Sequence, residues 1–305
     1  MASFPSRIGV LGLGFILRLL GIVAISFLLF QLAPSDPVRL RLGPMASESD
    51  VARMRVNMGF ERPVWERFTQ YVSNALRGDL GVSFRDERPV APLVWEKMQR
   101  TLVIAACALI PVLPFSYLAA LALNLWPRMT VPLLGVVKGL SLIPTFLIAI
   151  GGIMLLSLAG ISLTRNTGVP VLLLALFPFS ALTLLLHASA TASPPSLAWR
   201  SALAQGQPHW LAFHRALFRP AAGLWLTAWI TQFSFVIFVA MVVEVILTVD
   251  GCGGLLVDSI QRRDLPVVQG ILLFNAVLFL LLQTLSAFLQ PVLDPRCASP
   301  TQPTA

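Results

Sequence analysis

The chain has 305 residues, of which 56% are hydrophobic and only 12% are charged, and its mean hydropathy is +0.80. A soluble domain of this length does not bury so large an apolar fraction, so the composition excludes a soluble protein and predicts a chain with the bilayer as its solvent. The net charge of +8 comes from arginines scattered between apolar runs. Without a basic block, this charge argues against a nucleic-acid partner.

Long apolar stretches recur along the chain. A bilayer core about 30 Å thick needs about 20 apolar residues per helix. Six stretches meet this requirement, and we expect each to be a membrane span: residues 9–33, 101–126, 139–161, 169–187, 223–249 and 267–290. Arg18 interrupts the first, and its guanidinium is expected to reach the inner headgroups. A cleaved signal peptide is the alternative for this stretch, but no small-residue cleavage site precedes Pro34.

The segment between the first two spans, residues 34–100, is expected outside the cytoplasm as a small helical cap on the membrane surface. Ser47–Asp50 resembles a helix start, and Gly59 is expected to end the helix that follows. Pro63 precedes a second helical stretch, which has apolar residues on one face: Trp65, Phe68, Val72 and Leu76. Simple packing and contact with an external partner are both open roles for this segment.

The short connections predict the orientation. The link between the second and third spans carries Arg128 and Lys138 and no acid, and residues 188–222 are likewise basic without an acid. Basic loops stay on the cytoplasmic side, so we expect both connections inside. Residues 1–8 and 291–305 are then cytoplasmic termini.

The segment Ser193–Pro220 has the pattern of two helical halves that meet at Gly206–Pro208. Its charged and titratable residues are all basic, namely Arg200, His209, His214, Arg215 and Arg219. One interpretation is a cytoplasmic helix–turn–helix that a soluble partner binds. The alternative is an amphipathic segment on anionic lipids, to which Trp210 and Phe213 are equally suited.

Sequence motifs for catalysis or metal binding are absent. The chain has no GxxxxGK[ST], GxSxG or HExxH sequence, so we expect no ATP binding and no enzymatic activity from it. The cysteines, Cys107, Cys252 and Cys297, lack metal-ligand spacing. Three histidines in or beside one loop do not make a membrane-embedded metal site.

Polar residues within the expected spans are few. Glu244 lies in the fifth, about five residues before its expected outer end, and Asn275 and Gln283 lie in the last. An intramembrane acid normally faces the bundle interior or water. These residues could line a pathway or gate, or they could form hydrogen bonds between helices.

Several segments resemble the inner-membrane permeases of the dipeptide/oligopeptide/nickel class of binding-protein-dependent ABC importers. The likeness covers nearly the whole chain and is carried by five motifs: Phe15–Arg18, Pro34–Val38, Gly59–Pro63 followed by Gly78–Ser83, Ile143–Phe146 and Asp258–Gly270. The last of these, DSIQRRDLPVVQG, is the longest and most specific. The resemblance implies an all-α membrane protein of the type I ABC importer permease kind, in a bacterial inner membrane, with a core permease domain over residues 101–290.

The resemblance also implies partners and a site. The chain would form a translocation pathway with a second homologous permease subunit. It would receive a small peptide, nickel chelate or metallophore–metal complex from an extracytoplasmic solute-binding protein. On the other side of the membrane it would dock on two ATP-binding cassette subunits that hold ATP and Mg. The basic segment matches the loop that such permeases insert into their ATPase. Its coupling residues would be Trp199, Arg200, Ser201, Ala202, Leu203, Gly206 and Arg219.

A secondary transporter with no ATPase partner is the alternative. Such a protein is expected to show an internal repeat and several intramembrane charges. The sequence shows no obvious repeat, and within its apolar stretches only Glu244 and Arg18 are charged.

Overall fold

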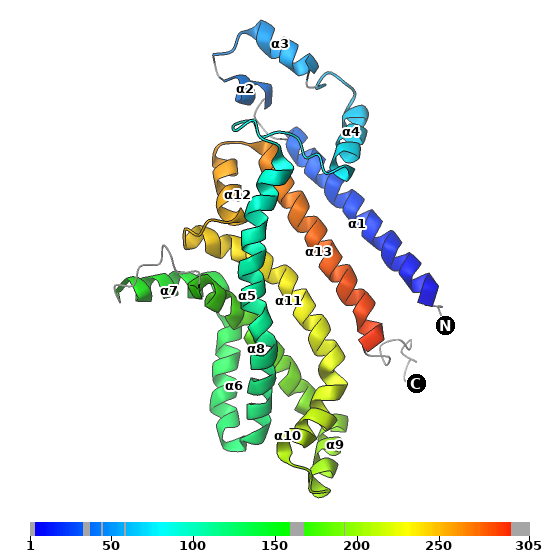
Figure 1. Ribbon diagram of the computed structural model, residues 1–305, viewed down its shortest axis with the longest axis vertical. Coiled ribbons are helices and arrows are strands. Elements are labelled where there is room, and N and C mark those ends of the chain that lie inside the picture. The colour runs from blue at the N-terminus through cyan, green and yellow to red at the C-terminus, as the bar shows by residue number, and fades with distance from the viewer. Residues whose placement is uncertain are drawn as a thin grey trace. The chain divides into compact units, whose positions relative to one another are not determined.

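The computed structural model describes residues 4–32, 37–43, 45–57, 59–158, 168–191 and 193–293. These residues are mostly helical (Figure 1), and the described part shows one isolated antiparallel bridge, between Val82 and Pro89. The predicted all-α fold is confirmed. The chain divides into two compact units, one of residues 1–101 and 250–280 and the other of residues 102–249 and 281–305.

The first unit contains a long N-terminal helix, three short helices and parts of two long ones. Its elements are α1 (Phe4–Leu32), α2 (Pro37–Leu42), α3 (Glu48–Asn57), α4 (Val64–Leu76), the first turns of α5 (Val90–Leu125), α12 (Cys252–Gln261) and most of α13 (Leu265–Leu293). α4 covers the amphipathic stretch that the sequence predicts, and Gly59 has a left-handed φ of 71° beyond the end of α3. Helices therefore form the segment between the first two expected spans.

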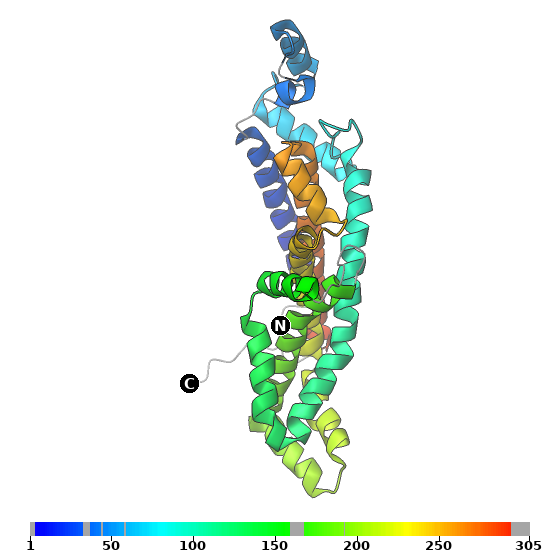
Figure 2. The same cartoon turned by 90° about the vertical axis from the view of Figure 1, so that its left-hand side faces the viewer.

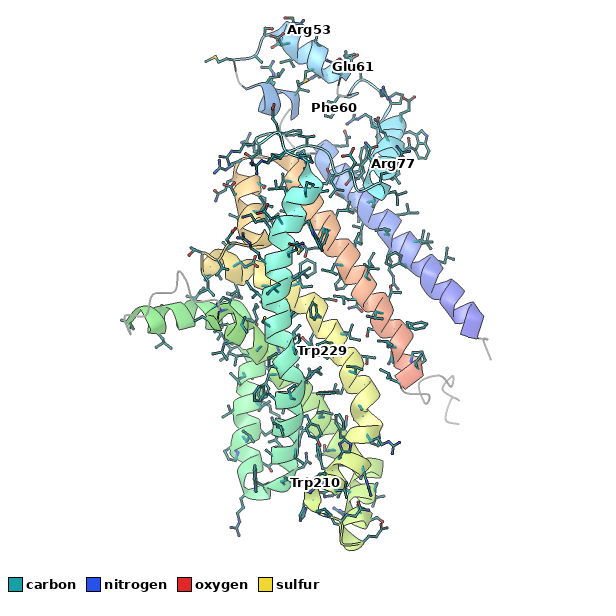
Figure 3. The ribbon with its side chains drawn as sticks, in the orientation of Figure 1. Arg53, Phe60, Glu61, Arg77, Trp210 and Trp229 are labelled. Carbon is teal, nitrogen blue, oxygen red and sulfur yellow. The ribbon has the colours of Figure 1, made fainter. Side chains whose placement is uncertain are left out.

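The start of α3 is capped by side chains. The backbone N–H of Asp50 donates to Oγ of Ser47 (3.1 Å), and the Ser47 hydroxyl donates to the Asp50 carboxylate (2.7 Å). The first of these bonds satisfies a backbone N–H that the first helical turn leaves unpaired, and the second orients the Ser47 hydroxyl. Hydrogen bonds from Ser47 and Arg53 lower the pKa of Asp50 (Figure 3 labels Arg53).

The second unit contains the remaining helices. They are α6 (Pro127–Leu142), α7 (Thr145–Leu158), α8 (Gly168–Thr191), α9 (Ser193–Ala204), α10 (His209–Ala212), a π-helical turn η1 (Phe213–Phe218) and α11 (Arg219–Ile246), with the adjoining parts of α5 and α13. α11 packs along α8, and α6 also packs on α8. Figures 1 and 2 show the α9–α10 hairpin at the same end of this unit as the α5–α6 junction.

Four of the described helical runs are long and apolar enough to cross a membrane: Val90–Leu125, Gly168–Thr191, His209–Ile246 and Leu265–Leu293. A bent pair over residues 130–152 would make a fifth, and α1 contains a shorter apolar stretch, Gly12–Leu28. Each expected span overlaps one of these elements, while the count of six crossings stays a prediction.

The third expected span, residues 139–161, is interrupted in the structure between α6 and α7. Helix α6 already begins at Pro127, and the chain bends by 97° between α6 and α7. Pro144 lies at the bend and lacks a backbone N–H, and Ile143 before it is extended (φ −84°, ψ 122°), as sterics before proline favour. Lys138, expected in a connection, therefore lies in a helix, and residue 161 lies outside the described residues.

Candidate functional site

The basic segment forms a helical hairpin, as its sequence predicts. At the end of α9 the N–H of Gly206 donates to the carbonyl of Leu203 (2.9 Å), and the N–H of Gln207 donates to that of Ala202 (3.2 Å). This is the Schellman arrangement, which needs a left-handed residue after the helix. Gly206 supplies it with a φ of 77°. The turn therefore reverses the chain directly into α10.

The second half of the hairpin is continuous with the fifth expected span. Residues His209–Ile246 form one helical run, which passes through the π-helical turn η1. π-Helical turns occur often at functional sites. The hairpin thus has no flexible connection to α11, whereas the sequence pattern predicts that this span starts at Gly223.

An aromatic cluster joins η1 to α5. The ring of Tyr117 lies 5.6 Å from that of Phe213 and 4.7 Å from that of Phe218, both edge-to-face. The Tyr117 hydroxyl lies 3.4 Å from Nδ1 of His214, and Phe213 is fully buried. Aromatic contacts of this geometry add stabilisation beyond area burial. The π-helical turn and α5 are therefore packed against each other.

Trp199 contacts the second half of the hairpin. Its ring lies 6.4 Å from that of Phe213, edge-to-face, and 6.0 Å from that of His209. The side chain is half-buried and packs against the core cluster of the unit. The resemblance implies that Trp199 couples to the ATPase, and that role stays a prediction; in the structure its ring joins the two halves of the hairpin.

The exposed surface of the hairpin contains other residues. Arg200, Ser201, Gly206 and Arg219 are exposed, while Ala202 and Leu203 are half-buried. Trp210, for which the sequence left a lipid-facing role open, is 58% exposed and lies near the hairpin tip (Figure 3). Because residues 188–222 contain no acid, this surface is cationic with one large aromatic side chain.

The polar residues of the long helices are largely buried. Glu244 is 1% exposed and lies in the last turn of α11, which ends at Ile246, nearer the helix end than expected. In the first unit Asn275 is buried and donates to the carbonyl of Ile271 (3.0 Å). In the second unit Gln283 is half-buried. Their burial leaves both the pathway and the packing interpretations open.

An apolar cavity of about 440 Å³ lies in the second unit at the α6–α7 bend. Its lining includes Phe146 beside the bend, Phe177 of α8, and Phe235 and Phe238 of α11. The rings of Phe177 and Phe235 lie 5.3 Å apart. A cavity with this lining accommodates an apolar group.

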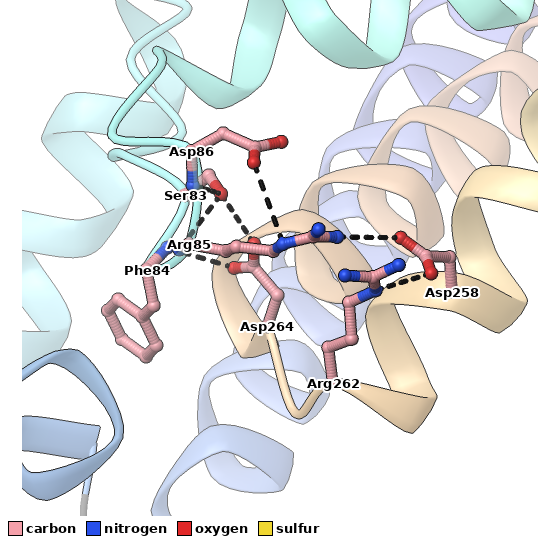
Figure 4. Close-up of polar contacts among 7 residues, drawn as sticks. All are labelled: Ser83, Phe84, Arg85, Asp86, Asp258, Arg262 and Asp264. Carbon is pink, nitrogen blue, oxygen red and sulfur yellow. Dashed lines mark hydrogen bonds and ion pairs between the residues drawn. The ribbon is translucent and has the colours of Figure 1, made fainter. Parts of the chain in front are cut away.

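A polar cluster in the first unit joins two of the motifs noted in the sequence (Figure 4). The buried Asp264 carboxylate accepts hydrogen bonds from the Ser83 hydroxyl and from the N–H of Phe84 (3.1 Å). Ser83 Oγ also accepts from the N–H of Asp86 (3.0 Å). Arg85 contacts Asp258 (3.4 Å) beside these bonds. Sequence reasoning did not name Ser83 or Asp264 as site residues, although both lie in the motifs that carry the resemblance.

A second set of contacts ties α5 to the segment after α11. Lys97 Nζ lies 2.6 Å from the Asp250 carboxylate, which Arg100 also contacts. The N–H of Cys252 donates to Oγ1 of Thr101 (3.0 Å). These bonds attach the start of α12 to α5.

Long apolar helices and a basic hairpin packed against them are the features of a multi-pass membrane subunit. The family model described as binding-protein-dependent transport system inner membrane component matches residues 112–299. The N-terminal model of the same system's membrane component matches residues 10–105. The chain therefore belongs to this family of inner-membrane components of ABC importers, and it is a multi-pass, non-catalytic permease subunit.

Curated relatives align over nearly the whole chain. The glutathione transport system permease protein GsiC of Escherichia coli (strain K12) is 29% identical over 296 residues, which cover 93% of this chain and 95% of GsiC. A putative peptide transport system permease protein of Brucella suis biovar 1 (strain 1330) is 32% identical over 295 residues, with 90% and 93% coverage. Membership of a binding-protein-dependent system implies ATPase and solute-binding partners for this chain.

Proposed function

We propose that this chain pairs with a second permease subunit to carry a short peptide or peptide-like compound across the inner membrane. The α9–α10 hairpin couples this transport to ATP hydrolysis by two ATPase subunits. ATP and Mg are bound by those subunits. The hairpin faces the cytoplasm, both termini lie on the same side, and a solute-binding protein delivers the substrate from outside.

The observation that carries the proposal is the construction of the hairpin. Its inner face, with Trp199 and Phe213, packs into the core of the second unit, while Arg200 and Trp210 remain exposed. Partner hot spots are rich in Trp and Arg. A surface of this kind on a rigid helical run suits a docking element, because force applied at the tip reaches α5 and α11.

The names of the relatives support a peptide-like substrate. GsiC is named for glutathione, itself a peptide, and the Brucella relative for peptides. The aromatic cavity at the α6–α7 bend is suited to an apolar side chain of such a substrate. A nickel chelate or a metallophore–metal complex is the alternative cargo.

Docking is tested in the assembled complex with Trp210→Ala. We expect weaker co-purification of the ATPase and a loss of substrate-stimulated ATP hydrolysis, because the exposed aromatic contact is removed. Trp126→Ala is the matched control, since Trp126 at the α5–α6 junction is 60% exposed and Trp210 is 58% exposed. Equal behaviour of the two variants would refute docking through the hairpin tip.

Substrate and energy source are tested by uptake into proteoliposomes that contain the full complex and its solute-binding protein. We expect uptake of labelled di- or tripeptides or of glutathione that requires ATP. Uptake of a nickel–histidine chelate alone would identify the alternative cargo. Uptake driven by an ion gradient without ATP would instead identify a secondary transporter.

A further inference from the structure

We propose that α4 is an interfacial helix whose outer side contacts lipid at the end of the bilayer core, rather than a helix held in the aqueous phase. The surface concerned contains Trp65, Val72 and Leu76. Figure 1 shows α4 beside one end of α1, and the two helices are in contact within the first unit. The sequence predicts a cap on the membrane surface here, with packing or an external partner as its role; direct lipid contact by named residues of α4 goes beyond both roles.

The depth of α4 follows from its partners on α1. The ring of Phe27 lies 5.4 Å from that of Phe68 and 5.9 Å from that of Tyr71. The hydroxyls of Ser26 and Tyr71 lie 3.3 Å apart. Ser26 and Phe27 both belong to the apolar stretch Gly12–Leu28 of α1. Helix α4 therefore lies level with the last turns of the apolar stretch of α1.

The side chains beside Ser26 and Phe27 indicate the environment of this turn of α1. Ile25 and Leu28 flank Ser26 and Phe27 and are 61% and 52% exposed. α13 contacts this turn as well, because Nε2 of Gln269 donates to the carbonyl of Ser26 (3.0 Å). Apolar side chains left exposed at this level, on a helix of a multi-pass membrane protein, are solvated by lipid chains. Lipid that reaches Ile25 is also at the level of α4.

The sequence of α4 matches an interfacial position. Phe68 and Tyr71 face α1, while Trp65, Val72 and Leu76 follow one another on an adjoining side of the helix. Trp65 is 71% and Leu76 77% exposed. Tryptophan is enriched where a bilayer meets water, and an amphipathic helix lies there with its apolar side in the acyl boundary.

The ends and the opposite side of α4 are polar. Arg62 precedes the helix and Arg77 follows it, and both are exposed (Figure 3 labels Arg77). Their guanidinium groups can donate to lipid phosphates. Glu66 and Gln70 are exposed on the side away from Trp65. The helix thus presents lipid-compatible groups toward the bilayer and polar groups toward water.

The test uses nitroxide labels on the full importer in nanodiscs of phosphatidylethanolamine and phosphatidylglycerol. Single cysteines replace Trp65, Leu76 or Gln70 in a background where Cys107, Cys252 and Cys297 are changed to Ala. Collisions with oxygen, which partitions into lipid, and with water-soluble Ni-EDDA are then compared. We expect labels at 65 and 76 to have an oxygen-to-nickel accessibility ratio several-fold above that of the matched label at 70.

Two results would overturn the proposal. Equal Ni-EDDA accessibility at 65, 70 and 76 would place α4 in water. Shielding of 65 and 76 from both reagents would mean that a protein, such as the second permease subunit or the solute-binding protein, covers this side.

A second measurement needs no label, so it does not depend on how the cysteine variants assemble. Brominated lipids should quench tryptophan fluorescence of the unlabelled complex more than that of its Trp65→Phe variant. An unchanged quenched fraction in that variant would also contradict the proposal.

Discussion

The Ser83 hydroxyl donates a hydrogen bond to the Asp264 carboxylate, which joins segments 181 residues apart in the chain. Ser83 lies before α5 and Asp264 directly before α13. Both residues are buried, so their polar groups depend on each other for hydrogen bonding. The contact fixes how the first turns of α5 and α13 meet within the first unit.

Asp264→Ala should destabilise the first unit. The substitution removes the acceptor for both Ser83 and the N–H of Phe84, and unsatisfied buried donors cost about 1–3 kcal/mol each. We expect a lower Tm for the detergent-solubilised complex. Asp258→Ala is the control, because its ion pairs are exposed and worth about 0–1 kcal/mol. A smaller loss for Asp264→Ala than for the control would contradict the role of the buried cluster.

Gly270→Ala should also destabilise the first unit, through overpacking. A Cβ at this position would lie 2.5 Å from Cγ1 of Val90, and overpacking costs about 1–3 kcal/mol. Val90→Ala in the same chain should recover part of the loss, which a double-mutant cycle of Tm values measures. Gly254→Ala, where nothing lies within 4 Å, should have little effect. Strict additivity of the Gly270 and Val90 changes would show that this contact is not the cause.

Gly206→Ala should weaken the hairpin turn without a steric clash, since an added Cβ would meet nothing within 4 Å and only the φ of 77° is unfavourable. A left-handed residue with a Cβ costs about 1–2 kcal/mol. Hydrogen exchange should become faster at the amides of Gly206 and Gln207. Gly206→Asn should accelerate this exchange less than Gly206→Ala, because Asn tolerates the left-handed conformation. Identical exchange in the two variants would count against the left-handed turn.

Thr248→Gly should stabilise the chain. Thr248 follows α11 with a φ of 52°, which is unfavourable for a β-branched residue. Relief of this strain, less the entropy cost of glycine, should gain about 1 kcal/mol. Thr69→Gly, inside the exposed part of α4, should instead lose about 0.3 kcal/mol of helix stability. A fall in Tm for both variants would argue against a strained Thr248.

Tyr117→Ala should uncouple ATP hydrolysis from substrate while leaving the ATPase bound, because it removes the ring between α5 and the hairpin. Tyr117→Phe keeps that ring and loses only the contact with His214, so it should remain close to wild type. Substrate-stimulated hydrolysis by the reconstituted complex measures the difference. Full stimulation in Tyr117→Ala would show that coupling does not pass through this cluster.

Local features of the hairpin could be predicted from the sequence, because they depend on neighbouring residues. Gly206 and Pro208 end one helix and begin the next through their own backbone preferences. The roles of Trp199 and Trp210 could not be separated in this way. Both are aromatic residues on a basic segment, and only the packing of Phe213 turns one inward and leaves the other exposed.

The bend in the third expected span also shows which features the sequence predicts and which only packing decides. Apolar runs around Pro111, Pro144 and Pro178 look alike in sequence, yet α5 and α8 continue through Pro111 and Pro178 while the chain breaks before Pro144. A proline inside a membrane helix is tolerated where neighbours satisfy the freed groups. Which neighbours are present is a tertiary property.

The sequence by itself determined the class of protein, the positions of the main apolar helices and the turn of the α9–α10 hairpin, because composition and local backbone preference act over a few residues. Only the tertiary structure decided that Ser83 meets Asp264, that Trp199 faces inward, and that α4 lies beside the apolar end of α1. Each of these depends on contacts between residues far apart in the chain, whose burial and hydrogen bonding are defined only when the helices pack.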